Sequence, residues 1–170
     1  MTSPGAPPVG GAPALTHVDS HGAARMVDIT DKQQSARQAV ATGVVRTTTE
    51  VVGLLLTDGL PKGDALMTAR IAGIMGAKRT SDLIPLCHPI AISGVTLDLS
   101  VGLSEIVITA TVKTTGQTGV EMEALTAVCV AGLTVHDMIK AVDPAAVLDA
   151  VRVDRKEGGK TGLWTRPEGR

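Results

Sequence analysis

Two neighbouring segments alternate apolar and polar residues, and this alternation constrains the fold more than any other feature of the sequence. The segments are residues 95–101 and 105–112, and Gly102-Leu103-Ser104 lies between them. Successive side chains of a strand point to opposite faces of a sheet, so the alternation predicts strands with one buried face. The short turn between them predicts an antiparallel hairpin.

Helical signals precede the hairpin. Thr47 and Glu50 have the spacing of a capping box, which predicts a short helix from Thr47 that stops at residues 58–59. Asp64 is a favourable N-cap for a second helix, whose apolar stripe runs to about residue 79.

Another helix follows the hairpin. Thr118 and Glu121 repeat the capping-box spacing and predict the longest helix, which ends near residue 140 or 142. Residues 81–89 predict an irregular loop, because Pro85 and Pro89 interrupt regular structure. The remaining predicted strands are residues 23–29, 39–47 and 151–153.

Helices interleaved with an antiparallel hairpin predict an α+β sandwich, with helices packed on one face of the sheet. The 170 residues fit a single domain. Residues 1–14 are rich in Pro and Gly and predict a disordered tail, so the domain is expected to span residues 15–170. The segment from about residue 156 is expected to be flexible.

Aromatic residues are almost absent, since the chain has one Trp and no Phe or Tyr. The core must therefore be built from Val, Ile, Leu, Ala and Met. The same absence argues against single-stranded nucleic-acid binding, which usually stacks bases on aromatic rings. Lys and Arg total 16 against 17 Asp and Glu, which gives little attraction for DNA or a membrane surface.

The two cysteines, Cys87 and Cys129, have no C-x-x-C spacing and are interpreted as reduced thiols in a cytoplasmic protein. No stretch reads as a membrane span, and the N-terminus lacks a signal-peptide pattern. No clustered histidines or Cys/His spacing predict a metal site. Gly159-Lys160-Thr161 ends like a phosphate-binding P-loop, but Asp154 stands where that motif needs glycine.

The loop around Cys87 and His88 is the first candidate for chemistry. His88 either binds a phosphate or carries a proton, or it satisfies helix-end carbonyl groups, and the sequence leaves both interpretations open. Cys87 is better interpreted as a packed thiol than as a nucleophile, because no base is visibly paired with it.

Acidic and basic residues on the helices supply further candidates. Glu121 is explained by capping alone, whereas Glu123 has no such structural reason. Asp137 and Lys140 are three residues apart and share a helix face, and spacing alone favours a surface ion pair over a catalytic one. The remaining basic candidates are Lys62 in a turn, Lys78 and Arg79 at a helix end, and Lys156 and Lys160 near the C-terminus.

Taken together, these segments resemble one family, the cyclic pyranopterin monophosphate synthases, also called molybdenum cofactor biosynthesis protein C. The matching stretches occur in family order from residue 15 to residue 162. They include Lys62-Gly-Asp64, Thr68-Ala-Arg-Ile-Ala-Gly73, Asp82-Leu-Ile-Pro-Leu-Cys-His-Pro89, Thr118-Gly-Val-Glu-Met-Glu-Ala-Leu-Thr126, Asp137-Met138, Lys140-Ala-Val142 and Gly158-Gly-Lys160.

The resemblance implies a ferredoxin-like subunit in a homohexamer, a trimer of dimers, with the active site at a subunit interface. It implies a lyase that converts a cyclised GTP derivative into cyclic pyranopterin monophosphate and releases diphosphate, with no metal or redox cofactor. By position, Lys62, Asp137 and Lys140 match the family's catalytic groups. The substrate-binding positions are Leu86, Cys87, His88, Glu121, Met122 and Glu123, with Lys78 and Lys156 assigned to the phosphates.

One departure from the family pattern lies beside the catalytic set, where His136 precedes Asp137 in place of an expected aromatic residue. The alternative function is a non-catalytic oligomer of the same fold that binds a nucleotide without turnover. The presence of all three residues of the catalytic set argues against this alternative.

Overall fold

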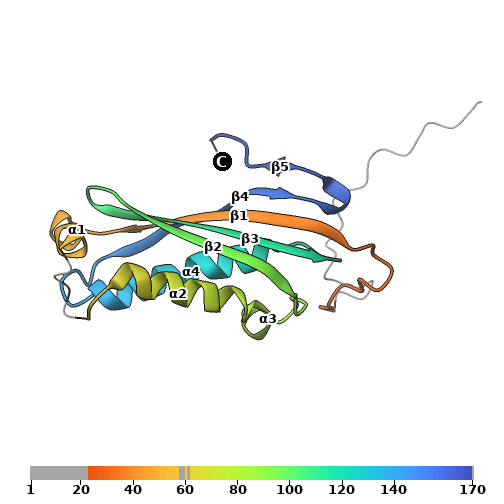
Figure 1. The fold of residues 1–170 in the computed structure, drawn as a ribbon, viewed down its shortest axis with the longest axis horizontal. Helices are drawn as coiled ribbons and strands as arrows, with labels where there is room; N and C mark the ends of the chain where they lie inside the picture. Colours follow the sequence, from red (N-terminus) through yellow and green to blue (C-terminus); the bar gives the residue numbers. More distant parts are fainter. Residues whose placement is uncertain (1–22, 58–59, 61, 170) are drawn as a thin grey trace, which may run out of the picture.

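The computed structural model of the chain describes residues 23–57, 60 and 62–169. In chain order the elements within them are β1 Ser35–Arg46, α1 Thr49–Leu56, α2 Ala65–Ala77, α3 Thr80–Leu83, β2 Ile92–Val101, β3 Glu105–Gly116, α4 Glu121–Ile139, β4 Val147–Glu157, a 3-10 turn Gly159–Thr161 and β5 Trp164–Thr165. One group of helices lies between β1 and β2, and a single long helix lies between β3 and β4 (Figure 1).

The strands form one antiparallel sheet in the order β2-β3-β1-β4-β5. Its first four strands, with helices between β1 and β2 and between β3 and β4, have the connection order of a ferredoxin-like fold. Helices α2 and α4 lie side by side on one face of this sheet (Figure 1). The predicted α+β fold, with helices on one face, is therefore confirmed.

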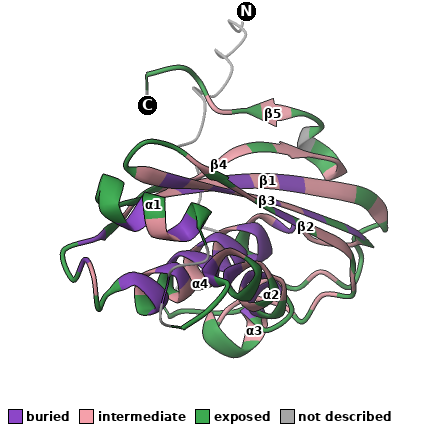
Figure 2. Ribbon diagram, turned by 60° about the vertical axis from the view of Figure 1, so that its left-hand side comes forward, coloured by how far each residue is buried: buried purple, intermediate pink, exposed green. Residues whose placement is uncertain are grey.

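The core lies between this sheet face and α4, and it is built without aromatic rings (Figure 2). Ala39, Ala41 and Val45 alternate along β1 toward the helices and are fully buried, as are Ile106 and Ile108 on β3. The same alternation in residues 95–101 and 105–112 predicted an antiparallel hairpin. This prediction is confirmed, because β2 and β3 pair antiparallel.

Small residues let the backbones approach one another closely in this core. A Cβ atom added at Gly43 of β1 would lie 2.6 Å from Val128 Cγ1 of α4. A Cβ at Gly73 of α2 would lie 2.8 Å from the backbone oxygen of Ala127 in α4. Because Ala and Gly fill little volume, the two layers must come close to reach the density of a packed interior.

The structure confirms one predicted helix start and shifts another by one residue. Asp64 caps α2 by accepting a hydrogen bond from the Met67 backbone N–H at 2.8 Å, so this prediction is confirmed. At α1 the cap is Thr48, one residue later than predicted. Thr47 precedes the N-cap, and its hydroxyl donates to the buried Asp143 carboxylate at 2.8 Å.

The capping box predicted for the longest helix is wrong. Helix α4 starts at Glu121 with Val120 at the N-cap, and an apolar side chain cannot cap it. The Glu121 carboxylate accepts a hydrogen bond from Lys156 Nζ at 2.9 Å. Helix α4 also has the length and hydropathy of a membrane-spanning helix, which corrects the expectation that no stretch does. Its apolar residues are explained by packing, since it contacts α2 and three strands of the sheet.

Other differences lie at element ends. Residues 23–29 form no strand, and only Ala24 makes an isolated bridge. A short helix, α3, occupies the start of the predicted loop, and β4 extends well beyond residues 151–153. Beyond residue 156, β5 pairs with β4, and the Arg166 guanidinium lies over the Trp164 ring at 5.9 Å. The predicted tail at residues 1–14 and the predicted stop of α1 at residues 58–59 lie outside the described residues.

Two glycine substitutions test the close packing of α2 on α4. Gly73→Ala should destabilise the fold by about 1–2 kcal/mol, because the new methyl group meets backbone that cannot move aside. Gly53→Ala on α1 meets nothing within 4 Å and should stabilise it by about 0.5–1 kcal/mol. Urea unfolding of both variants measures the difference, and an equal effect of both would contradict this account of the packing.

Candidate active site

Two lysines meet on one carboxylate where α4 ends. Asp137 Oδ2 accepts a hydrogen bond from Lys62 Nζ at 2.6 Å, and Asp137 Oδ1 lies 2.7 Å from Lys140 Nζ. Lys62 Nζ also donates to the Asp137 backbone oxygen at 2.9 Å. Hydrogen bonds from Lys140, and then from Lys62, lower the pKa of Asp137 to about 2.

Sequence spacing alone predicted that only two of these three residues lie close together. Asp137 and Lys140 share one turn of α4, whereas Lys62 precedes α2 and arrives through the packing of α2 against α4. All three side chains are about half exposed, so the cluster is open to a ligand. One carboxylate and two ammonium groups leave a net positive charge that can bind an anion and donate protons.

A second group of predicted residues lies at the opposite end of α4. Glu121 pairs with Lys156 of β4, and Met122 is exposed. Glu123 is buried, with 3% of its surface exposed, and its Oε2 atom has no hydrogen-bond partner. Burial, with a smaller contribution from the Glu121 charge, raises the pKa of Glu123 to about 7.

The loop after α3 carries the predicted residues Leu86, Cys87 and His88, all of them half-buried. Burial raises the pKa of the Cys87 thiol, and the Glu123 charge adds to this effect. The thiol is therefore kept protonated, as a packed cysteine should be. Hydrogen bonds from the Thr30 hydroxyl and backbone N–H lower the pKa of Asp28, and His88 makes a smaller contribution in the same direction.

A cavity of about 750 Å³ opens beside the start of α4. Its walls include the Glu121–Lys156 pair and the glycines Gly158 and Gly159. The basic residues that line it are Lys32, Arg37, Lys156 and Lys160.

Sequence reasoning missed Lys32 and Arg37. Arg37 Nε donates to the Gly116 backbone oxygen at 2.9 Å, which holds the turn that leads into α4. Arg37 precedes the strand predicted at residues 39–47 and belongs to no motif, so only the three-dimensional pairing of β1 with β3 reveals its position.

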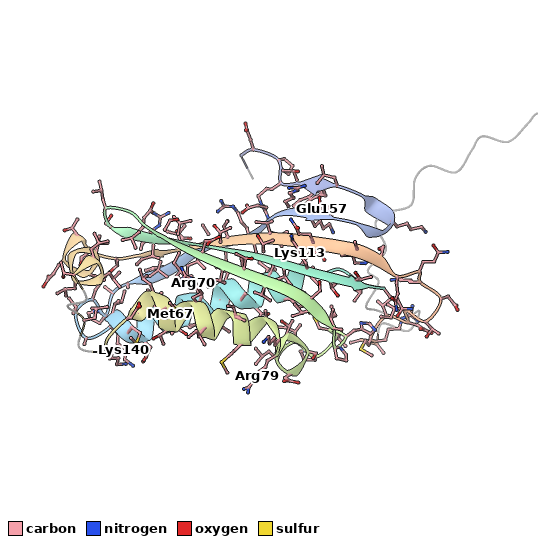
Figure 3. The ribbon with its side chains drawn as sticks, in the orientation of Figure 1. Met67, Arg70, Arg79, Lys113, Lys140 and Glu157 are labelled. Atoms are coloured by element: carbon pink, nitrogen blue, oxygen red, sulfur yellow. The ribbon has the colours of Figure 1, made fainter. Side chains whose placement is uncertain are left out.

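The predicted site residues therefore form two separate groups in one chain. Fourteen residues of α4 separate Glu123 from Asp137, a distance of roughly 20 Å along a helix. Lys78 is exposed beyond the end of α2, away from the Lys62 cluster. Lys140 and Arg79, the neighbour of Lys78, mark the two ends of the helix layer (Figure 3).

The described residues hold no group of three or more His, Cys, Asp or Glu side chains that could bind a metal ion.

The buried carboxyl makes a testable contribution to stability. Glu123→Gln should stabilise the fold at pH 8 relative to wild type and change little at pH 4. The folded state keeps the Glu123 proton up to a pKa of about 7, whereas the unfolded state releases it near 4.5. Stability therefore falls as the pH rises between these values, by about 3 kcal/mol in total.

Denaturant unfolding at both pH values measures this effect, with Glu50→Gln on the exposed start of α1 as the control. The test is the difference between the two pH values, because any fixed cost of the buried amide cancels. An effect of Glu123→Gln that does not depend on pH would contradict the neutral carboxyl.

Comparison with known proteins adds to this geometry. The model of the MoaC family matches residues 26–159. The chain is 64% identical over 152 residues to "Cyclic pyranopterin monophosphate synthase 2" of Mycobacterium tuberculosis, covering 89% of this chain and 91% of that protein. It is 66% identical over 152 residues to the Streptomyces coelicolor protein named cyclic pyranopterin monophosphate synthase, covering 89% of each.

The Streptomyces avermitilis protein of the same name is 62% identical over 169 residues, which cover 98% of this chain and 99% of that protein. The match thus includes the cluster of Lys62, Asp137 and Lys140, the loop after α3 and the start of α4. On this evidence the chain belongs to the MoaC family.

Proposed function

We propose that this chain is a cyclic pyranopterin monophosphate synthase, a phosphorus–oxygen lyase of molybdenum cofactor biosynthesis in the cytoplasm. It converts the 3',8-cyclo-7,8-dihydro derivative of GTP into cyclic pyranopterin monophosphate and diphosphate. The meeting of Lys62, Asp137 and Lys140 carries the proposal, because residues from distant parts of the chain converge on one carboxylate. Bacterial relatives with this name, 62–66% identical, support it.

The Lys62–Asp137–Lys140 cluster supplies the proton transfers. The purine-derived ring must open at an aminal carbon and close again as a pterin, which moves several protons. Asp137 holds both ammonium groups in place, so each can donate a proton to a reacting nitrogen or oxygen and take one back in a later step.

The second group of residues is suited to holding the nucleotide. The first-turn amides of α4 have no side-chain cap, and four basic residues line the cavity beside them against three acidic ones, Asp31, Glu121 and Glu157. Such a surface attracts a triphosphate. A sugar hydroxyl then attacks the α-phosphorus, the bond from this phosphorus to diphosphate breaks, and the hydroxyl proton passes to a base. Cations such as Lys78, Lys156 and His88 neutralise the charge that develops.

Both groups must act on one substrate, and one chain holds them roughly 20 Å apart along α4. We therefore propose that the site is completed by a neighbouring copy, in a hexamer of three dimers. Each site takes the Lys62 cluster from one copy and the start of α4, with the loop after α3, from the other.

An exposed apolar stripe on α2 supports this assembly. Met67, Ile71 and Met75 are four residues apart and 47%, 53% and 50% exposed. This spacing puts the three residues on one face of α2, and Met67 lies between Lys140 and Arg79 in Figure 3. A two-fold axis near Ile71 would pack the stripe of one copy against the same stripe of its partner, because a two-fold interface is self-complementary. The opposite ends of the two copies would then meet.

Substitution of the cluster tests the catalytic role. Lys62→Ala, Asp137→Asn and Lys140→Ala should each lower kcat by about 10²–10⁴-fold, because each removes a positioned proton carrier or its anchor. Pterin formation and diphosphate release from the cyclised nucleotide give the rates. Lys113→Ala, on an exposed position of β3, is the control and should retain full rate. Full activity of all three cluster variants, or binding without turnover by wild type, would contradict the proposal.

Mixing two inactive variants tests the shared site. Lys62→Ala and His88→Ala alter the two different groups of site residues. Half of the randomly mixed dimers contain one copy of each variant. In each of these dimers, one of the two shared sites has both groups intact. Mixing should thus restore about a quarter of wild-type activity. The control mixes Lys62→Ala with Lys140→Ala, which alter the same end and should restore none. Failure of the first mixture, with subunit exchange verified by mass, would place the whole site in one copy.

A further inference from the structure

Gln117 joins three segments that line the cavity of about 750 Å³ beside the start of α4. They are the turn between β3 and α4, in which Gln117 lies, the start of β1, and the irregular segment before it. The Gln117 backbone oxygen accepts a hydrogen bond from Arg37 Nη2 of β1 at 3.3 Å. Arg37 Nε also donates to the neighbouring Gly116 oxygen. The Arg37 guanidinium therefore fixes the turn that carries Gln117 to the sheet.

The side-chain amide of Gln117 holds the irregular segment in place. Its Nε2 atom donates to the backbone oxygens of Thr30 at 3.2 Å and Lys32 at 2.9 Å. Both acceptors are carbonyl oxygens, so only the two N–H groups of the amide can satisfy them. Residues 28–34 form neither a helix nor a strand, and the Lys32 backbone N–H closes a turn on the Ile29 oxygen at 3.0 Å. The Gln117 amide thus fastens an exposed turn that regular structure does not hold.

This turn carries Lys32 to the wall of the cavity. Among the described residues, the Lys32 ammonium has no ion-pair partner, whereas Lys156 on the same wall is paired with Glu121 at 2.9 Å. Lys32 can therefore bind a phosphate without first leaving a carboxylate. A lysine acts on a phosphate as a point charge, and its attraction falls with distance, so the placement of the turn decides how much Lys32 contributes.

We propose that Gln117 is a positioning residue for the triphosphate of the substrate. Its amide holds the turn at residues 29–32, so that Lys32 points its charge at the phosphates in the cavity. Gln117 acts through Lys32 and not through its own contact with the nucleotide. The inference rests on the proposed function, from which it takes its ligand.

Millisecond hydrogen exchange read by mass spectrometry tests the Gln117 contacts without any ligand. Gln117→Met keeps the length of the side chain and removes both donors, so exchange in residues 29–34 should speed up about tenfold. Gln117→Lys keeps N–H donors at a similar reach and should restore slow exchange. Gln117→Glu presents only acceptors to the two carbonyl oxygens and should not. Thr115→Ala, exposed at the end of β3, is the control and should exchange like wild type.

Steady-state kinetics with the cyclised nucleotide test what these contacts do. Gln117→Met should raise KM about tenfold and leave kcat within about twofold, because it weakens the hold on the phosphates and not the proton transfers. The Kd for inorganic triphosphate, measured by calorimetry, should rise by a similar factor. Lys32→Ala should raise KM at least as much. In the Lys32→Ala background Gln117→Met should raise KM no further, because its effect passes through Lys32.

Three results would overturn the positioning role and leave the proposed function intact. They are wild-type exchange in Gln117→Met, a loss of kcat at unchanged KM, and independent effects of Gln117→Met and Lys32→Ala on KM in the double variant. A wild-type protein that neither turns over the cyclised nucleotide nor binds inorganic triphosphate would overturn both the positioning role and the proposed function.

Discussion

The close approach of α4 to the rest of the molecule is the constraint on which the structure depends. Without aromatic side chains to fill space, the core reaches its density because Gly43 and Gly73 let the backbones of β1 and α2 come close to α4. Helix α4 contacts α2 and three strands and is buried along one face. This packing therefore holds the two ends of α4 at a fixed separation. It also fixes the positions of the functional residues on the helix.

The two ends of α4 place carboxyl groups in opposite chemical states. Two ammonium groups hold Asp137 ionised, with a pKa of about 2, whereas burial raises the pKa of Glu123 to about 7. Pairs of titratable groups whose surroundings separate their pKa values are typical of sites that divide acid and base roles. Here one helix provides both members, and the separation follows from exposure at one end and enclosure at the other.

What the sequence could predict depended on the range of the interactions involved. The Asp64 cap and the β2–β3 hairpin rest on neighbours within a few residues, and both are confirmed. The capping box of Thr118 and Glu121 failed because α4 begins only at Glu121, whose carboxylate pairs with Lys156, 35 residues further on.

The candidate site follows the same rule. Spacing placed Lys140 beside Asp137, whereas Lys62 entered only through the family pattern, because helix packing brings it there. Arg37 had neither local spacing nor a motif, and its contact with Gly116 exists only once β1 pairs with β3. The division of the site between the ends of α4 likewise has no signature in the sequence, since it is a property of helix length and packing.

The single tryptophan of the chain lies on β5, paired with Lys156 and stacked under the Arg166 guanidinium. The core around α4 therefore contributes no intrinsic fluorescence, because the chain has no Tyr or Phe and its one Trp lies on β5. All indole emission comes from one edge of the sheet. Emission changes in this protein report on the C-terminal strand beside Lys156, and an unfolding curve followed by fluorescence describes that edge before it describes the core.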